Sequence, residues 1–182
     1  MKTITRLLMI LTLAVFAACE GPVGPPGPPG EDGLDGFDGE NGYLFEIEGT
    51  FSPTNDYTLY FAFPEDFTTY DTDIVMVYIL WDQVESSTGE WLDVWRALPQ
   101  TVVVNEGVIQ YNFDYTVGDV QIFIEETVGE LLPEETDNQV FRIAVLPADF
   151  WSTKSVDINN LDAVMKTMNV SEKTVKKMSI TK

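Results

Sequence analysis

The chain has 182 residues, of which 30 are acidic and 10 are basic, so its formal net charge at pH 7 is −20. One cysteine and no histidine are present, which excludes disulfide bonds within the chain and the histidine that most often acts as general base or zinc ligand. The acidic balance argues against nucleic acid as a partner, because its phosphates would be repelled.

The N-terminus is typical of a bacterial export signal. A positive start precedes an apolar run over residues 7–16, which is shorter than the roughly 20 residues that span a bilayer. Residues 16–19 (FAAC) resemble a lipobox, whose cysteine is acylated and becomes the mature N-terminus. We expect a signal peptide at 1–18 and a lipid on Cys19 that anchors the protein in the cell envelope, at the outer membrane. The alternative is a secretory signal cleaved after Ala18, which leaves a free thiol.

A strict glycine period follows the cysteine. Glycine stands at every third position for eight triplets: Gly21, Gly24, Gly27, Gly30, Gly33, Gly36, Gly39 and Gly42. Three polyproline-II chains wound together have room only for glycine at their common axis, so this period predicts a collagen-like stalk over 19–44. Five unpaired acids in its second half oppose close association of three such chains. We therefore expect a homotrimer only if the following domain helps to assemble it. A monomeric extended spacer is the alternative.

Short apolar segments separated by turn residues begin at Tyr43. Strands are predicted at residues 43–51, 58–63, 73–82, 90–98, 101–104, 108–116, 119–125 and 140–146. The segment Ile74–Trp81 is apolar throughout, which indicates a strand buried on both faces. The pattern predicts a mainly β head over 45–150, folded as an antiparallel β-sandwich, and leaves jelly-roll connectivity open.

The last segment, 151–182, differs in character. Leu161, Val164, Met165 and Met168 recur with helical spacing, and Ser171 is placed to cap a second helical turn. Six of the ten basic residues lie here. We expect a basic helical tail that covers one edge of the acidic head, with an amphipathic helix on the membrane surface as the alternative.

One part of the chain has residues suited to a binding site. Trp91, Asp93 and Trp95 alternate along one predicted strand, and two indoles beside a carboxylate suit a glycan. Burial of both tryptophans in the core is the competing interpretation, because Leu92 and Val94 make the other face apolar too.

No catalytic, cofactor or metal motif stands out. A hydrolase with two carboxylates would need a pair that no motif selects among 30 acids. Calcium could bind loosely to surface carboxylates, but residues 157–162 (DINNLD) lack the glycine and terminal glutamate of a calcium loop. We therefore expect no enzymatic activity.

The chain resembles a group of collagen-like lipoproteins from Bacteroidota-type bacteria, which join a lipobox, a short glycine-repeat run and a small β head. The resemblance extends over most of the mature chain, in the segments Asp73–Trp81, Val94–Thr101, Tyr111–Thr116, Asp119–Phe123 and Gln139–Pro147. The group brings no established activity to this chain. From the expected lipid anchor, stalk and β head, we expect a structural or interaction protein of the cell envelope, with an envelope or extracellular protein or a glycan as partner. A glycan-binding surface lipoprotein is the second hypothesis.

Overall fold

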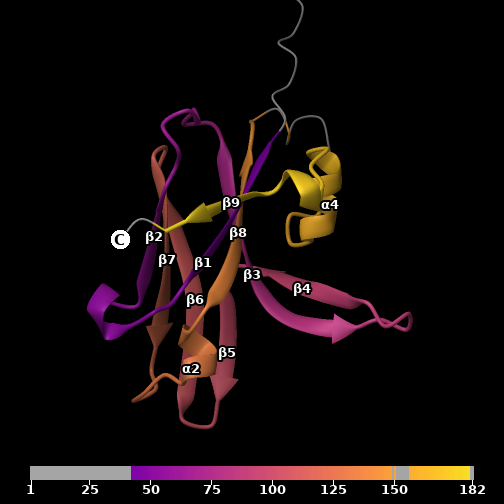
Figure 1. Ribbon diagram of the computed structural model, residues 1–182. Helices are drawn as coiled ribbons and strands as arrows, with labels where there is room; N and C mark the ends of the chain where they lie inside the picture. Colours follow the sequence, from indigo (N-terminus) through magenta and orange to yellow (C-terminus); the bar gives the residue numbers. More distant parts are fainter. Residues whose placement is uncertain (1–41, 149, 151–155, 181–182) are drawn as a thin grey trace, which may run out of the picture. The chain divides into compact units, whose positions relative to one another are not determined.

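The computed structural model describes residues 42–148, 150 and 156–180. The expected signal peptide, Cys19 and the collagen glycines from Gly21 to Gly39 lie outside these residues. The described part is mainly β, with two sheets stacked face to face (Figure 1). The predicted class, a mainly β sandwich, is therefore confirmed at this level.

The five-stranded sheet has the order β4-β3-β8-β1-β9 and the four-stranded sheet has the order β2-β7-β6-β5. The strands are β1 (Tyr43–Gly49), β2 (Thr58–Ala62), β3 (Ile74–Glu85), β4 (Trp91–Ala97), β5 (Gln100–Val104), β6 (Gly107–Tyr115), β7 (Asp119–Glu126), β8 (Gln139–Leu146) and β9 (Lys176–Ser179). Neighbouring strands are antiparallel except for β1 and β9, which are parallel. Hairpins join β3 to β4 and link β5, β6 and β7, so much of the connectivity is local.

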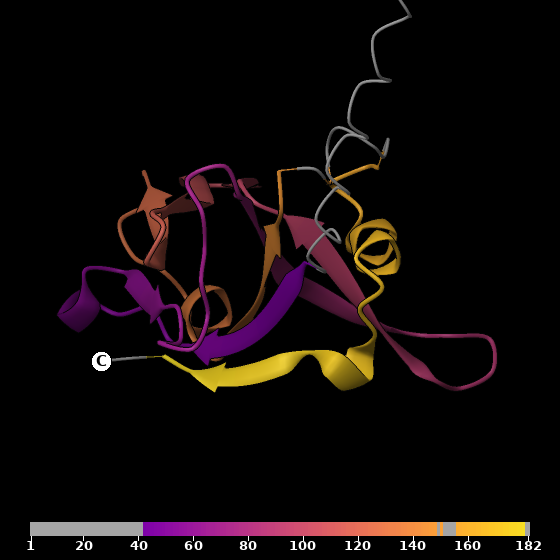
Figure 2. The same cartoon turned by 90° about the horizontal axis from the view of Figure 1, so that it is seen from above.

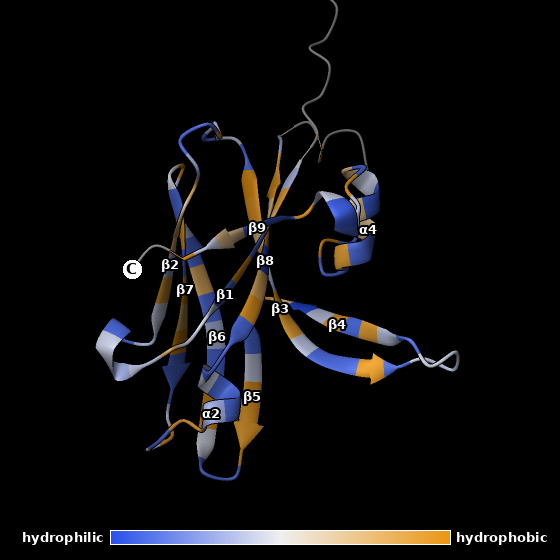
Figure 3. Cartoon of the chain, viewed as in Figure 1, coloured by the Kyte–Doolittle hydropathy of each residue, from blue (hydrophilic) through white to orange (hydrophobic). Residues whose placement is uncertain are grey.

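The main core lies between the two sheets. Alternate residues of each strand face it, as Phe45 and Ile47 do on β1 and Val120 and Ile122 on β7, and Figure 3 shows this alternation along the strands. The period of two matches the pleat of a strand, which points successive side chains to opposite faces. The alternation in the sequence therefore predicted both the strands and their inward faces.

A second apolar layer covers the outer face of the five-stranded sheet. Helix α4 (Leu161–Thr167) packs there, with Val164 and Met168 almost fully buried, and the predicted helical face is confirmed. Its N-cap is Asn160, whose side chain accepts a hydrogen bond from the backbone N–H of residue 163. The helix explains the unbroken apolar run in β3, because Val77 faces the main core and Tyr78 faces the helix layer.

The chain after α4 differs from the predicted second helical turn. Ser171 does precede a turn, the short 3₁₀ helix η2 (Glu172–Thr174), but the following residues form β9. This strand adds to the edge of β1, where backbone hydrogen bonds replace those of a helix. Among the elements whose bounds the structure describes, the other short helices are η1 (Pro53–Asn55) and α2 (Pro133–Thr136).

The first strand, β1, includes the last two residues of the glycine repeat. Tyr43 and Leu44, expected in the stalk, pair with Val145 and Ala144 of β8. Gly42 itself is packed: a Cβ atom at this position would lie 2.6 Å from Met168 Cε and 3.0 Å from the carbonyl oxygen of Val145. The last glycine of the repeat is thus closely packed within the head, and a side chain there would displace Met168.

The β3–β4 hairpin extends beyond the rest of the sandwich (Figures 1 and 2). The register shifts between Leu80 and Asp82, which leaves Trp81 as the extra residue of a bulge. Bulges bend a strand and increase its twist, which accounts for the divergence of the hairpin from the sheet. Its far part is exposed on both faces, with Val84, Trp91 and Leu92 open to solvent. Among the described helices, none has the length and apolar character to cross a membrane.

Candidate functional site

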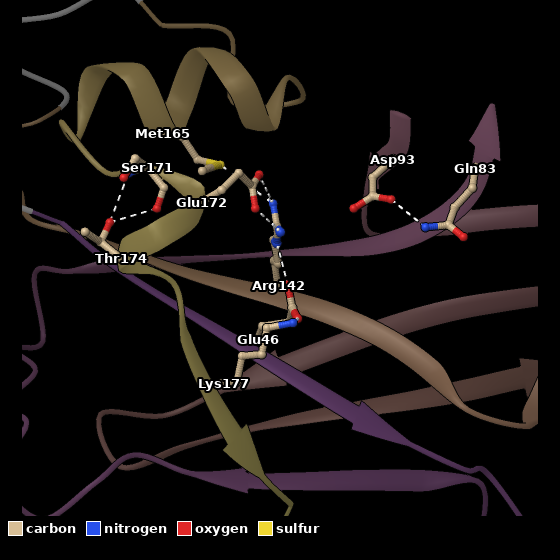
Figure 4. Close-up of polar contacts among 9 residues, drawn as sticks. All are labelled: Glu46, Gln83, Asp93, Arg142, Met165, Ser171, Glu172, Thr174 and Lys177. Carbon is tan, nitrogen blue, oxygen red and sulfur yellow. Dashed lines mark hydrogen bonds and ion pairs between the residues drawn. The ribbon is translucent and has the colours of Figure 1, made fainter. Parts of the chain in front are cut away.

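A groove of about 450 Å³ lies on the outer face of the five-stranded sheet, between the C-terminal segment and the β3–β4 hairpin. Charged and aromatic side chains converge there from four strands and from η2, and β3 adds the amide of Gln83. The polar and aromatic residues that line it include Glu46, Gln83, Asp93, Trp95, Arg142, Glu172 and Lys177. Figure 4 shows the polar contacts of six of these residues.

Arg142 is the centre of this cluster. It lies on β8 with only 3% of its surface exposed, in a strand whose other residues are mostly apolar. Its Nε donates to Glu46 Oε2 at 3.0 Å, and its two terminal nitrogens donate to the carboxylate of Glu172 at 2.7 and 2.6 Å. The guanidinium also stacks on Trp95, with Cζ 4.2 Å from the ring centroid. Two carboxylates thus bind the edge of this buried cation and an aromatic ring covers one of its faces, which offsets part of its desolvation.

Glu46 joins two cations at the inner wall of the groove. It accepts from Arg142 and, through Oε1, from Lys177 Nζ at 2.7 Å. Burial by itself raises the pKa of Glu46, but the hydrogen bonds and charges of Lys177 and Arg142 outweigh it and hold this pKa below its usual value. Burial conversely lowers the pKa of Arg142, and its two glutamate partners raise it above its usual value. Both groups are therefore charged at neutral pH.

The hairpin supplies the outer part of the site. Asp93 and Gln83 are directly opposite each other on β4 and β3, and Gln83 Nε2 donates to Asp93 Oδ1 at 2.7 Å. Trp95, two residues further along β4, is half-buried against the helix layer. Trp91 is 67% exposed and lies on the same strand face, beyond the groove lining.

The three residues singled out from the sequence are thus divided between two environments. Asp93 and Trp95 come together in the groove, whereas Trp91 is on the projecting part of the hairpin. The alternative prediction, that both tryptophans are buried in the core, holds in part for Trp95, because the Arg142 guanidinium covers its ring. It does not hold for Trp91, which is exposed.

The sequence reasoning missed Arg142, Glu46, Glu172, Lys177 and Gln83. One signal was available for Arg142, because an arginine within an otherwise apolar strand is almost always paired when buried. Its partners could not be identified, because they come from β1 and from a segment whose strand was expected to be helical.

The ion pairs of Glu46 make this carboxylate unsuited to the role of general acid in a glycosidase. A general acid needs a raised pKa, and the pKa of Glu46 is lowered by its ion pairs. Within the described ranges, no group of three or more cysteine, aspartate or glutamate residues is placed to hold a metal ion.

The described residues form further hollows, of which two are well defined. One of about 770 Å³ lies near Tyr60 and ends at Ile180, the last described residue, and one of about 200 Å³ lies beside Tyr70 and Tyr115. The first is lined by apolar, hydroxyl and amide side chains without a charged group.

Comparison with known proteins gives no relative. The chain matches no protein-family model, no curated protein and no solved structure.

Proposed function

We propose that this protein is a lipid-anchored component of the cell envelope that holds a β-sandwich head on a short collagen-like stalk. In this proposal the head binds another molecule and catalyses no reaction. The observation that carries it is the order of the parts along the chain: the lipobox cysteine Cys19, the glycine repeat, and a sandwich whose first strand begins at Tyr43. No residue separates the end of the repeat from the packing of the head, since Gly42 already contacts it.

The chemistry of the groove supports binding rather than turnover. Its one buried cation is engaged by two carboxylates and an aromatic ring, so it is arranged to stabilise the fold. The exposed side chains of the hairpin, with Trp91 foremost, are available to a partner. Exposed tryptophan is common where one protein surface meets another molecule.

Lipid attachment is tested by replacing the single cysteine. Cys19→Ser is expected to abolish incorporation of labelled palmitate and to remove the protein from the membrane fraction of bacteria that express the full chain. A stable anchor needs at least two acyl chains, because one gives only marginal membrane binding. Tyr70→Ala, a change on the surface of the head, should leave labelling unchanged.

A full-length protein that is never labelled and is recovered in the soluble fraction would contradict the proposal. It would favour the ordinary secretory signal cleaved after Ala18.

A further inference from the structure

We propose that the outer face of the β3–β4 hairpin, together with the adjoining groove, binds an uncharged oligosaccharide. This inference rests on the proposed function, in which the head binds a partner, and it names the chemical class of that partner. It uses three residues of β4 and one of β3: Trp91, Asp93, Trp95 and Gln83.

The spacing of the residues fits a linear ligand that lies along β4. Trp91, Asp93 and Trp95 occupy alternate positions, so their side chains leave the same face of the strand. At about 3.3 Å per residue, the α-carbons of Trp91 and Trp95 are roughly 13 Å apart, which is the length of two to three sugar rings. The ends of this path are aromatic and its middle is polar.

The polar middle is arranged to receive hydroxyl groups. Gln83 Nε2 donates to Asp93 Oδ1, and this bond fixes both side chains across the hairpin. This bond uses Asp93 Oδ1 and Gln83 Nε2 and leaves the other oxygen of each side chain, Asp93 Oδ2 and Gln83 Oε1, without a donor among the described side chains. These two oxygens can therefore accept hydrogen bonds from adjacent sugar hydroxyls. Because the two side chains are already held in place, a ligand does not have to order them.

The two tryptophans have different parts in the site. Trp91 offers an open indole ring, 67% exposed, on which the apolar face of a sugar can stack. Trp95 is held by the Arg142 guanidinium, which is itself fixed by Glu46 and Glu172. It therefore forms a rigid inner end to the groove, and stacking energy is expected to come mainly from Trp91.

Charge selects against anionic sugars. The groove is lined by four carboxylates, those of Glu46, Glu48, Asp93 and Glu172, against two basic groups. Both basic groups are already paired, Arg142 with Glu46 and Glu172, and Lys177 with Glu46. An acidic glycan would meet this surface on a protein of net charge −20, so an uncharged chain is the favoured ligand.

The proposal is tested by calorimetric titration of the full-length protein in detergent. The probes are β-1,4-linked hexamers of glucose and of N-acetylglucosamine, an α-1,6-linked mannose oligomer, and heparin as the anionic comparison. We expect at least one uncharged oligomer to bind with a dissociation constant of about 1 mM or tighter, and heparin not to bind.

Matched variants locate the site. Trp91→Ala and Asp93→Ala should each weaken binding by about tenfold or more, which corresponds to the loss of one stacking or charge-assisted contact. Trp91→Phe should restore part of the affinity, because the apolar ring remains. Tyr70→Ala removes an equally open ring (54% exposed) elsewhere on the head and should leave affinity unchanged. Trp91 and Asp93 are exposed, so unchanged urea midpoints will show that the variants are folded.

Three results would overturn the inference: no binding by any uncharged oligomer, preferential binding of heparin, or binding that survives both Trp91→Ala and Asp93→Ala. None of these results affects palmitate labelling of Cys19, so failure here is distinguishable from failure of the proposed function.

Discussion

Arg142 shows how a single residue joins three parts of the head. It stands on β8, is buried to 3% exposure, and contacts Glu46 of β1, Trp95 of β4 and Glu172 of η2. Its two glutamate partners differ in environment, since the side chain of Glu46 is 12% exposed and that of Glu172 is 65% exposed. Substitution of Arg142, of Glu46 and of Glu172 should therefore lower the free energy of unfolding by different amounts.

We predict that Arg142→Met lowers the free energy of unfolding by about 3 kcal/mol, because it leaves Glu46 buried with only Lys177 beside it. Glu172→Gln should cost less than about 1 kcal/mol, because this carboxylate is largely hydrated. Urea denaturation at pH 7 measures both. The double variant Arg142→Met/Glu46→Gln should be more stable than the sum of its single changes implies. Equal costs for Arg142→Met and Glu172→Gln would contradict this account.

At the scale of the element, the C-terminal strand β9 depends on the same cluster. It is four residues long, pairs in parallel with β1 and has one ion pair to it, between Lys177 and Glu46. Glu46 also binds Arg142, and Arg142 in turn binds Glu172 of η2. The Glu46 carboxylate therefore supports the attachment of β9 directly and that of η2 through Arg142. Neutralising Glu46 should weaken the docking of β9.

The ion pairs of Glu46 predict that the free energy of unfolding falls at acidic pH. The pKa of Glu46 is lower in the folded protein than its ordinary value of 4.5. The carboxylate therefore contributes stability above about pH 4.5, and this contribution is lost as the pH falls through its folded pKa. The difference in unfolding free energy between the wild type and Glu46→Gln should be constant near pH 7 and should shrink below about pH 4.5. Urea titrations from pH 7 to about pH 3 will check this, and a difference that stays constant throughout would be inconsistent with the ion pairs.

The elements that the sequence predicted well are those whose pattern is local. The alternation in Val108–Thr116 and the apolar run Ile74–Trp81 mark strands β6 and β3, and Leu161–Met168 marks the helix that covers the sheet. Strand β9 was missed because its lysine-rich sequence has no alternation, and its pairing with β1 is fixed by a contact 131 residues away in sequence, from Glu46 to Lys177. In the groove, Asp93 and Trp95 could be predicted because they are neighbours on one strand. Arg142 and its partners could not, because they are distant in sequence and meet only in the folded protein.

At the scale of the whole molecule, the start of β1 changes the length of the proposed stalk. The eighth triplet, Gly42-Tyr43-Leu44, cannot wind in a triple helix while Tyr43 and Leu44 pair with β8. Seven triplets then remain, which as a triple helix would extend about 65 Å at roughly 3.1 Å per residue. Because this repeat is short and its second half is acidic, formation of a trimer should depend on association of the heads.

We predict that residues 20–182 form a trimer in sedimentation experiments, and that the head alone, residues 43–182, retains at least weak self-association. Calcium or added salt should favour the trimer by screening the acidic second half of the repeat. Gly30→Ala, which places a methyl group at the axis of a triple helix, should shift residues 20–182 toward monomer. Monomers of both proteins under every condition would identify the repeat as a single-chain spacer.

The position of β1 within its sheet bears on mechanical strength. Any tension that enters the head through residue 42 acts on a strand flanked on both sides, by β8 and β9. A pull along this strand loads its seven register pairs with β8 together, as a shear, and does not peel them apart one at a time from an edge. From β8 the force continues through β3 to the hairpin that carries Trp91, along hydrogen-bonded neighbours of a single sheet. A head built in this way would resist unfolding under load while it holds the partner that we propose.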